Sequence, residues 1–425
     1  MTVTYLKKAD PRPAAENNDI RDIVRVMLSN IERGGEKAVR DYARKLDGWE
    51  GEIVLSDAER QAACDRIPEE LKRDIRYAHA NIKKFAEAQQ ATIQDCEVEV
   101  IPGLIAGQKQ IPVNAAGCYV PGGRYSHIAS ALMTITTAKV AGVKHITAVS
   151  PTKPETGIPD PIIFAMEVAG ADTILNLGGV QAIAAMAEGL FGCEPADILV
   201  GPGNSYVAEA KRMLFGKIGI DMFAGPTDSL VIADSSADIE TVSWDLVSQA
   251  EHGADSPVWL VTTDRALAEG VMAKADKLID QLPEPNGPAA RIAWRERAEV
   301  ILCDTREEAA EVSDRYAPEH LQVMAEDLDW WLDRLTAYGS LFLGKETTVP
   351  FGDKISGPNH VLPTSGAARY TGGLSVHKFT KTVTWQRATE AASHELASRA
   401  ARISRFEGME GHARASELRL KPRVV

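Results

Sequence analysis

The chain has 425 residues, of which 44% are hydrophobic and 25% are charged, as is usual for a globular protein. This length predicts two domains rather than one. The net charge of −13 argues against nucleic acid and anionic membranes as partners, but it leaves room for a local basic pocket that binds an anionic substrate.

The first hundred residues are predicted to be mostly helical. Within residues 20–46, apolar side chains recur at the spacing of one helical face, namely Ile20, Ile23, Val24, Met27 and Ile31. Ser56 followed by Glu59 is a capping box, and it predicts the start of a second helix that runs to Pro68. A third long helix is predicted over residues 71–88.

From about residue 111, short apolar or β-branched runs alternate with segments of helical spacing. Strands are predicted at residues 145–149, 173–177, 197–200, 229–233, 258–262, 300–303, 321–324 and 340–343. Helices are predicted between them at residues 180–189, 204–215, 237–250 and 265–281. This alternation indicates parallel sheets that are covered by helices on both faces.

We therefore expect an α/β protein with two Rossmann-like parallel-sheet domains. The first domain is predicted to be discontinuous, with residues 1–118 joined by residues 232–372, and to carry the metal and catalytic residues. The second domain, residues 119–231, is predicted to bind a nucleotide. Residues 373–425 are predicted to form a C-terminal tail of helix and loop.

Cysteine usage and apolar runs predict the compartment. The five cysteines have no regular spacing and no CxxC pair, so neither a disulfide framework nor a thiolate zinc site is expected. No apolar signal core follows Met1, and no apolar run reaches transmembrane length. These features predict a cytoplasmic protein with reduced thiols.

Three glycine-containing loops follow predicted strands, where open α/β sheets bind ligands. They span residues 119–124, 177–183 and 201–206. Paired glycines let a backbone approach a phosphate closely. None of the three loops completes GxGxxG, so the usual dinucleotide fingerprint is absent. Taken singly, each loop fits a simple turn between a strand and a helix better than a ligand site.

Three segments offer nitrogen and oxygen ligands for a metal ion. Gln249 and His252 are three residues apart at the end of a predicted helix, so both project from one face. Asp353 lies in a glycine-flanked loop, and Glu407 and His412 lie near the C-terminus. Such ligands, with room left for substrate, are typical of catalytic zinc sites. Taken by itself, the spacing also fits a histidine that caps the helix or packs as a polar group.

A carboxylate and an imidazole stand side by side at Glu319 and His320, just before a predicted strand. Adjacent Glu and His side chains suit two proton transfers, one from an alcohol and one from a water. The alternative is a solvated pair in a loop. His360 lies in a segment that is dense in turn residues, and its alternative is a simple turn.

Taken in order, these motifs resemble the histidinol dehydrogenase family over nearly the whole chain. The blocks that carry the resemblance are Tyr119-Val-Pro-Gly-Gly, Gly201-Pro-Gly-Asn204, Ala224-Gly-Pro, Leu230-Val-Ile-Ala-Asp234, Ser248-Gln-Ala-Glu-His-Gly253, Ala317-Pro-Glu-His320, Gly357-Pro-Asn-His-Val-Leu-Pro-Thr364 and Gly373-Leu-Ser-Val. So many blocks in one order make the resemblance specific.

The resemblance implies functional roles that the residues alone do not establish. It implies zinc ligands at Gln249, His252, Asp353 and His412, and a general acid/base pair at Glu319 and His320. It implies substrate contacts at Thr227, His360 and Glu407, and NAD contacts at Tyr119, Gln181 and Asn204. It also implies a homodimer in which Glu407 and His412 complete the active site of the partner subunit.

The reaction that the resemblance implies is an NAD-linked oxidation of an alcohol to a carboxylate. Hydride would leave the substrate twice, with an aldehyde held in the site between the two transfers. His320 would take the hydroxyl proton, and Glu319 would activate the water that hydrates the aldehyde.

The sequence departs from histidinol-oxidising members at several positions. Thr227 and Asp228 stand where Ser-Glu is usual, and Lys354 replaces the tyrosine that follows the metal-binding aspartate. A lysine there suits an anionic substrate better than cationic histidinol. Together with Thr382-Val-Thr-Trp-Gln, these departures resemble the sulfopropanediol 3-dehydrogenase branch, which oxidises 2,3-dihydroxypropane-1-sulfonate to sulfolactate.

Two other functions remain open at this point. One is oxidation of L-histidinol to L-histidine. The other is binding of a metal or a nucleotide without catalysis, which the presence of both Glu319 and His320 disfavours. The cation that would bind a sulfonate is one of Lys354, Lys378, Lys381 and Arg124.

Overall fold

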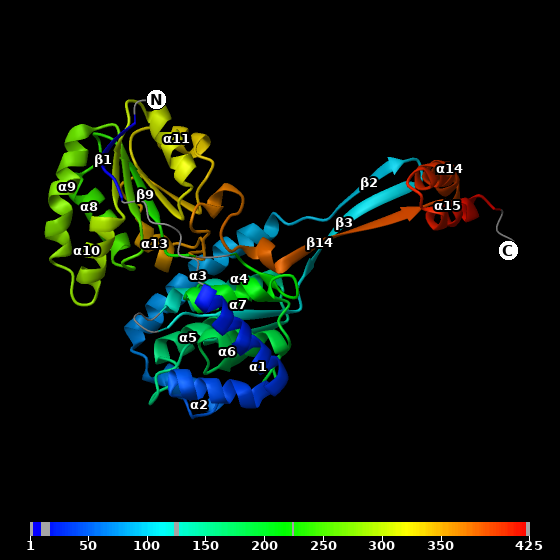
Figure 1. The fold of residues 1–425 in the computed structure, drawn as a ribbon, viewed down its shortest axis with the longest axis horizontal. Helices are drawn as coiled ribbons and strands as arrows, with labels where there is room; N and C mark the ends of the chain where they lie inside the picture. The colour runs from blue at the N-terminus through cyan, green and yellow to red at the C-terminus, as the bar shows by residue number, and fades with distance from the viewer. Residues whose placement is uncertain (1–2, 10–17, 123–126, 223–224, 422–425) are drawn as a thin grey trace. The chain divides into compact units, whose positions relative to one another are not determined.

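The structure, a computed structural model, describes residues 3–9, 18–122, 127–222 and 225–421. The chain forms two compact units (Figure 1). The first unit comprises residues 1–88 and 113–379, and the second comprises residues 89–112 and 380–425. Among the residues described, no helix is long and apolar enough to cross a membrane.

The first unit contains a six-stranded sheet, called here the first sheet. Its strands lie in the order β1 (Thr4–Lys7), β11 (Glu299–Leu302), β10 (Val258–Thr262), β9 (Ser229–Ala233), β12 (His320–Met324) and β13 (Ser340–Leu343). Only β1 runs antiparallel to its neighbour. One core cluster joins the sheet to α8 (Ile239–Ala250), α9 (Arg265–Ile279) and α10 (Asn286–Glu296), and another joins it to α11 (Arg306–Tyr316) and α12 (Leu328–Arg334) (Figure 1). Because both faces are covered, the central strands are almost continuous apolar runs.

The same unit contains a second sheet, which has five parallel strands. Their order is β6 (Thr173–Leu175), β5 (His145–Val149), β4 (Ala115–Tyr119), β7 (Ile198–Val200) and β8 (Gly219–Ile220). A core cluster joins this sheet to α1 (Asn18–Tyr42), α6 (Gly179–Glu188) and α7 (Ser205–Leu214). The helices α4 (Ile128–Ala141) and α5 (Asp160–Ala169) pack against each other, and α2 (Asp57–Arg66) packs on α5. The remaining helical segments are α3 (Glu69–Ala91), α13 (Val349–Lys354) and short turns at Ala43–Asp47, Ala367–Arg369 and Val376–Phe379.

Both sheets change direction at their centre. From β4 the chain moves outward through β5 and β6, then returns to the other side of β4 for β7 and β8. From β9 it moves outward through β10 and β11, then returns for β12 and β13. Such a switch opens a crevice at the carboxyl ends of the two central strands, which is where α/β proteins usually bind ligands.

The N-terminal helices pack differently from the sequence-based expectation, which grouped residues 1–118 with the first sheet. Only β1 joins that sheet, whereas α1 packs on α6 and α7, and α2 packs on α5. The central strand of the second sheet, β4, also begins earlier than expected, at Ala115. An amphipathic helix reveals in its sequence which face is buried, but not which sheet covers that face. The sequence pattern could therefore not assign α1 to its sheet.

The second unit contains an antiparallel sheet with the order β14 (Thr380–Ala388), β3 (Leu104–Pro112) and β2 (Cys96–Ile101). Its helices α14 (Glu390–Phe406) and α15 (Glu410–Glu417) pack on each other and on a short turn at Leu418–Leu420. The expectation of a tail of helix and loop was therefore incomplete. Most side chains of β2 and β14 are exposed, so these strands lack the apolar alternation that marks a half-buried strand.

Candidate active site

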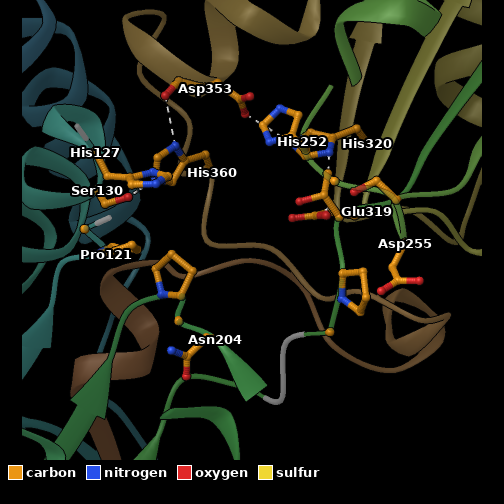
Figure 2. Close-up of a pocket in the computed structure, with 18 of the residues that line it drawn as sticks. Pro121, His127, Ser130, Asn204, His252, Asp255, Glu319, His320, Asp353 and His360 are labelled. Atoms are coloured by element: carbon orange, nitrogen blue, oxygen red, sulfur yellow. Dashed lines mark hydrogen bonds and ion pairs between the residues drawn. The ribbon is translucent and has the colours of Figure 1, made fainter. Parts of the chain in front are cut away.

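The first unit encloses a cavity of about 440 Å³ (Figure 2). The cavity is lined by loops at the carboxyl ends of β4 and β7 and by the segments that lead into β9 and β12. The second sheet thus presents its carboxyl edge to the cavity, whereas the first sheet presents its amino edge. The cavity gathers most of the predicted site residues, namely Tyr119, Asn204, Thr227, His252, Glu319, His320, Asp353, Lys354 and His360.

Glu319 and His320 are held at the start of β12. Helix α11 ends at Tyr316, and Ala317 adopts a left-handed conformation (φ 48°) that turns the chain into the strand. Asp228 holds the main chain of this pair through two hydrogen bonds. Its carboxylate accepts the N–H of Glu319 at 2.6 Å, and its carbonyl accepts the N–H of His320 at 3.2 Å. In return, the Glu319 carboxylate accepts the N–H of Asp228 at 3.2 Å.

The His320 imidazole is buried between two carboxyl groups. Its Nε2 lies 3.3 Å from Asp353 Oδ1, and its Nδ1 lies 3.8 Å from Glu319 Oε2. Neither nitrogen makes a well-directed hydrogen bond within the described part of the chain. Burial alone would lower the pKa of His320, but the negative charges of Glu319 and Asp353 outweigh it and raise that pKa. Burial raises the pKa of the Glu319 carboxyl to about 8, so both groups can exchange protons near neutral pH.

His360 links the cavity wall to the Asp353 segment. Its Nδ1 lies 2.9 Å from the Asp353 carbonyl, and its Nε2 lies 2.8 Å from Ser130 Oγ. A carbonyl can only accept, so Nδ1 carries the proton and Nε2 accepts the hydroxyl hydrogen of Ser130. Burial lowers the pKa of His360 to about 4, so the ring is neutral. This side chain therefore fixes the position of Asp353 through its main chain.

The predicted zinc ligands of the first unit have suitable donor atoms and charge states. Burial lowers the pKa of His252, which leaves a neutral imidazole. Burial would raise the pKa of Asp353, but its interaction with the His320 ring lowers that pKa below its usual range. A neutral imidazole and a carboxylate are the states in which these groups bind zinc.

This ligand set is incomplete within the first unit. Gln249 is buried and is not among the residues that line the cavity, and its amide oxygen accepts the Ser229 hydroxyl hydrogen at 3.1 Å. His252 follows the end of α8, which closes at Ala250. In the described ranges, no group of three or more His, Cys, Asp and Glu is placed to hold a metal ion. A zinc ion would thus need Gln249 and a further ligand, the role predicted for His412.

The predicted nucleotide contacts lie at the carboxyl edge of the second sheet. Tyr119 ends β4, and its hydroxyl accepts the N–H of Gly179 at 3.2 Å. Asn204 caps α7 by accepting the N–H groups of Tyr206 and Val207. Gln181 is buried and is not among the residues that line the cavity, and its amide donates to Asp47 at 2.8 Å.

A buried ion pair fixes the loop that follows β7. The Lys211 ammonium donates to the Gly201 carbonyl at 2.9 Å and pairs with Asp221, whose carboxylate accepts the Gly201 N–H at 2.7 Å. Gly201 has a φ of +112°, and a Cβ at this position would lie 2.0 Å from the Tyr119 carbonyl oxygen. Glycine and the ion pair together let the β7 loop approach β4 closely.

Replacing Lys211 with Met should lower the free energy of unfolding by about 3–5 kcal/mol, because it leaves the Asp221 carboxylate buried without its partner. The matched control is Lys217→Met, which removes an ion pair to Glu188 whose side chains are 57% and 30% exposed. That change should cost less than about 1 kcal/mol. Urea unfolding followed by circular dichroism compares the two variants, and equal losses would contradict the role of the buried pair.

Other predicted residues are not among those that line this cavity. Glu407 follows α14 and His412 lies in α15, both in the second unit, where His412 lines a separate cavity of about 660 Å³. Lys381 lies on β14, and Lys378 donates to Thr371 Oγ1 at 3.1 Å. Arg124 falls outside the described residues.

Two cavity residues were missed by sequence reasoning. His127 and Ser130 line the cavity at the start of α4. His127 is an isolated histidine, and Ser130 lies in an apolar helix, so neither belongs to a pattern that indicates a site.

The sequence model of the family described as histidinol dehydrogenase matches residues 10–420. This chain belongs to the histidinol dehydrogenase family. Its family relatives include a sulfopropanediol 3-dehydrogenase of Ruegeria pomeroyi, which is 63% identical over 420 residues, covering 99% of this chain and 97% of the relative. A histidinol dehydrogenase of Thermus thermophilus is 40% identical over 400 residues, covering 94% of each chain.

A solved structure agrees with this membership of the histidinol dehydrogenase family. The crystal structure of histidinol dehydrogenase from Elizabethkingia anophelis matches with a TM-score of 0.90 and 34% identity, covering 96% of this chain and 94% of that one. The predicted family is therefore confirmed, together with an α/β fold of parallel sheets and helices.

Proposed function

We propose that this chain is a zinc-dependent, NAD-linked dehydrogenase that oxidises 2,3-dihydroxypropane-1-sulfonate to sulfolactate. The observation that carries the proposal is the 63% identity, over 99% of the chain, to a sulfopropanediol 3-dehydrogenase. The reaction would consume the alcohol, one water and two NAD⁺, and it would yield the carboxylate, two NADH and three protons.

The residues around the cavity suit this chemistry. When bound, zinc would hold and orient the substrate oxygens, and NAD would accept hydride. The His320 imidazole would take the hydroxyl proton, and the neighbouring carboxylates would stabilise the positive charge that the ring gains. Glu319 would take a proton from the water that adds to the aldehyde, and its raised pKa makes its carboxylate a stronger base.

The charge on the cavity wall supports an anionic substrate. Lys354 lines the cavity directly beside Asp353, and its positive charge disfavours protonation of His127, His252 and His360. The same charge would repel a cationic substrate such as histidinol and attract a sulfonate.

We also propose that Gln249, His252, Asp353 and His412 hold the zinc ion. His412 and Glu407 belong to the second unit, and as the family resemblance implies, they would complete the site of a partner subunit in a homodimer. Tyr119, Gln181 and Asn204 would form the NAD site, and Thr227 and His360 would face the substrate.

The test is NADH production by the purified, zinc-loaded protein, with 2,3-dihydroxypropane-1-sulfonate and L-histidinol supplied in parallel. We expect two NADH for each molecule of the sulfonate and at most trace activity with histidinol. Faster oxidation of histidinol than of the sulfonate would refute the proposed substrate. A yield of one NADH would refute oxidation to the carboxylate.

A further inference from the structure

Asp245 lies on α8 and binds side chains from two other elements of the first unit. Its Oδ2 accepts from Gln322 Nε2 at 2.8 Å, and its Oδ1 accepts from the Thr348 hydroxyl at 2.9 Å. The Gln322 side chain is buried, and its amide also donates to the Thr347 carbonyl at 2.9 Å. A carboxylate can only accept hydrogen bonds, so Asp245 suits both of its donors. None of these four residues is among those that line the cavity of the candidate active site.

Two of the elements joined by Asp245 carry residues of the proposed zinc and base sites. Gln249, a proposed zinc ligand, lies one helical turn after Asp245, so both side chains project from the same face of α8. Both bind the first sheet, since Gln249 accepts from Ser229 and Asp245 accepts from Gln322. The proposed base, His320, lies two residues before Gln322 on β12, so these two side chains share one face of the sheet. Asp245 thus ties the helix of a zinc ligand to the strand of the base.

The third element, α13, is held at both ends by contacts from outside the helix. It has only six residues, Val349–Lys354, so its own hydrogen bonds stabilise it little. Thr348 occupies the N-cap, where a threonine usually accepts a backbone N–H of its own helix. Its side chain makes no such bond and donates to Asp245 instead. Near the other end, the Asp353 carbonyl accepts from His360 at 2.9 Å.

We infer that Asp245 is a positioning residue that ties α13 to α8 and β12, and thereby keeps Asp353 in place to bind zinc and to contact His320. This inference rests on the proposed function, in which Gln249, His252 and Asp353 bind the metal. Groups that orient metal ligands from outside change metal affinity or activity by about 10- to 100-fold when they are lost. Loss of the Asp245 hydrogen bonds should therefore speed the release of zinc, although every ligand is still present.

The test measures the rate at which the zinc-loaded protein releases zinc to a chromophoric chelator. Thr348→Val replaces the hydroxyl that binds Asp245 with a methyl group, and it should release zinc about tenfold faster than the wild type. Asp245→Ala should release zinc about 10- to 100-fold faster. Asp245→Asn should lie closer to the wild type, because its amide oxygen can accept from Gln322 and its NH₂ group can donate to the Thr348 oxygen.

The matched control is Thr241→Val, on the same helix as Asp245. The Thr241 hydroxyl donates to the Asp238 carboxylate at 2.9 Å, so this change removes a hydrogen bond of the same kind near the first turn of α8. It should leave zinc release unchanged. Urea unfolding of both variants measures how much stability each has lost. Equal zinc release by Thr348→Val and Thr241→Val would show that Asp245 stabilises the fold without positioning the metal ligands, and would overturn the inference.

Steady-state kinetics separate this inference from the proposed function. In Thr348→Val, kcat should fall while the KM for NAD stays unchanged. If the wild type oxidises 2,3-dihydroxypropane-1-sulfonate and Thr348→Val releases zinc at the wild-type rate, the positioning role is wrong while the function stands. If zinc release depends on Asp245 and Thr348 but the wild type does not oxidise the diol, the positioning role stands and the proposed substrate is wrong. A wild type that binds no zinc would overturn both.

Discussion

Replacing His320 with Asn should lower kcat by about 10³-fold, because the variant loses the base that takes the substrate proton. Asn is polar and smaller than His, so it fits the buried position at the start of β12 without adding bulk. The affinity for NAD should change little, since Tyr119 and Asn204 lie at the edge of the other sheet. Stopped-flow absorbance at 340 nm would measure the rate of the first NADH formed.

The matched control is His145→Asn, which changes an exposed histidine at the first residue of β5. Its kcat should equal that of the wild type. Glu319→Gln provides a contrast, because the first oxidation requires no water. This variant should form close to one NADH per substrate and leave an aldehyde that a hydrazine reagent can trap. An unchanged kcat in His320→Asn would rule out its role as base, and an unchanged yield in Glu319→Gln would rule out its role with water.

Replacing Asp353 with Ala should remove most bound zinc and lower kcat by about 10³-fold or more, since several kcal/mol of substrate polarisation would be lost with the metal. The same change removes the carboxylate that lies 3.3 Å from His320 Nε2. Zinc content after dialysis, measured by inductively coupled plasma mass spectrometry, should fall from one ion per subunit to nearly none.

Two comparisons distinguish the effect of losing the metal from the effect of disrupting the fold. Asp276→Ala changes an exposed residue on α9 and should retain both zinc and activity. Wild-type protein stripped by a chelator should lose activity and regain it when zinc is added, whereas Asp353→Ala should not recover. Full zinc content in the dialysed Asp353→Ala protein would show that this carboxylate is not a ligand.

Much of the first unit could be predicted because its local signals are strong. The strands at His145–Val149, Ser229–Ala233 and Val258–Thr262 have the expected bounds, since they are short apolar runs buried on both faces. The capping box at Ser56 and Glu59 is present in the structure. The hairpin of β2 and β3 and its partner β14 could not be predicted from apolar alternation, because most side chains of β2 and β14 are exposed.

The candidate site could likewise be predicted only in part. Glu319 and His320 could be proposed because two proton-transfer groups are adjacent in the sequence. The contacts that hold them could not be, since Asp228 lies 91 residues before Glu319 in the chain. His127 could be linked to the site only from the folded structure, in which it interacts with Lys354. The roles proposed for the site residues remain predictions, including those of Gln181, Gln249, Glu407 and His412.

Because the first sheet uses its amino edge at the cavity, the loops at its carboxyl edge are separate from the reacting groups. His320 pairs with Ser229 at the amino edge of the first sheet, so a slip of one residue in β12 would turn the imidazole to the opposite face. The carboxyl edge of that sheet holds a separate cavity of about 590 Å³, where Arg306 and Asp327 bind each other at 3.0 Å. Loops at this edge can therefore gain or lose residues without displacing the reacting groups. A fused reporter or an inserted domain would be best tolerated there.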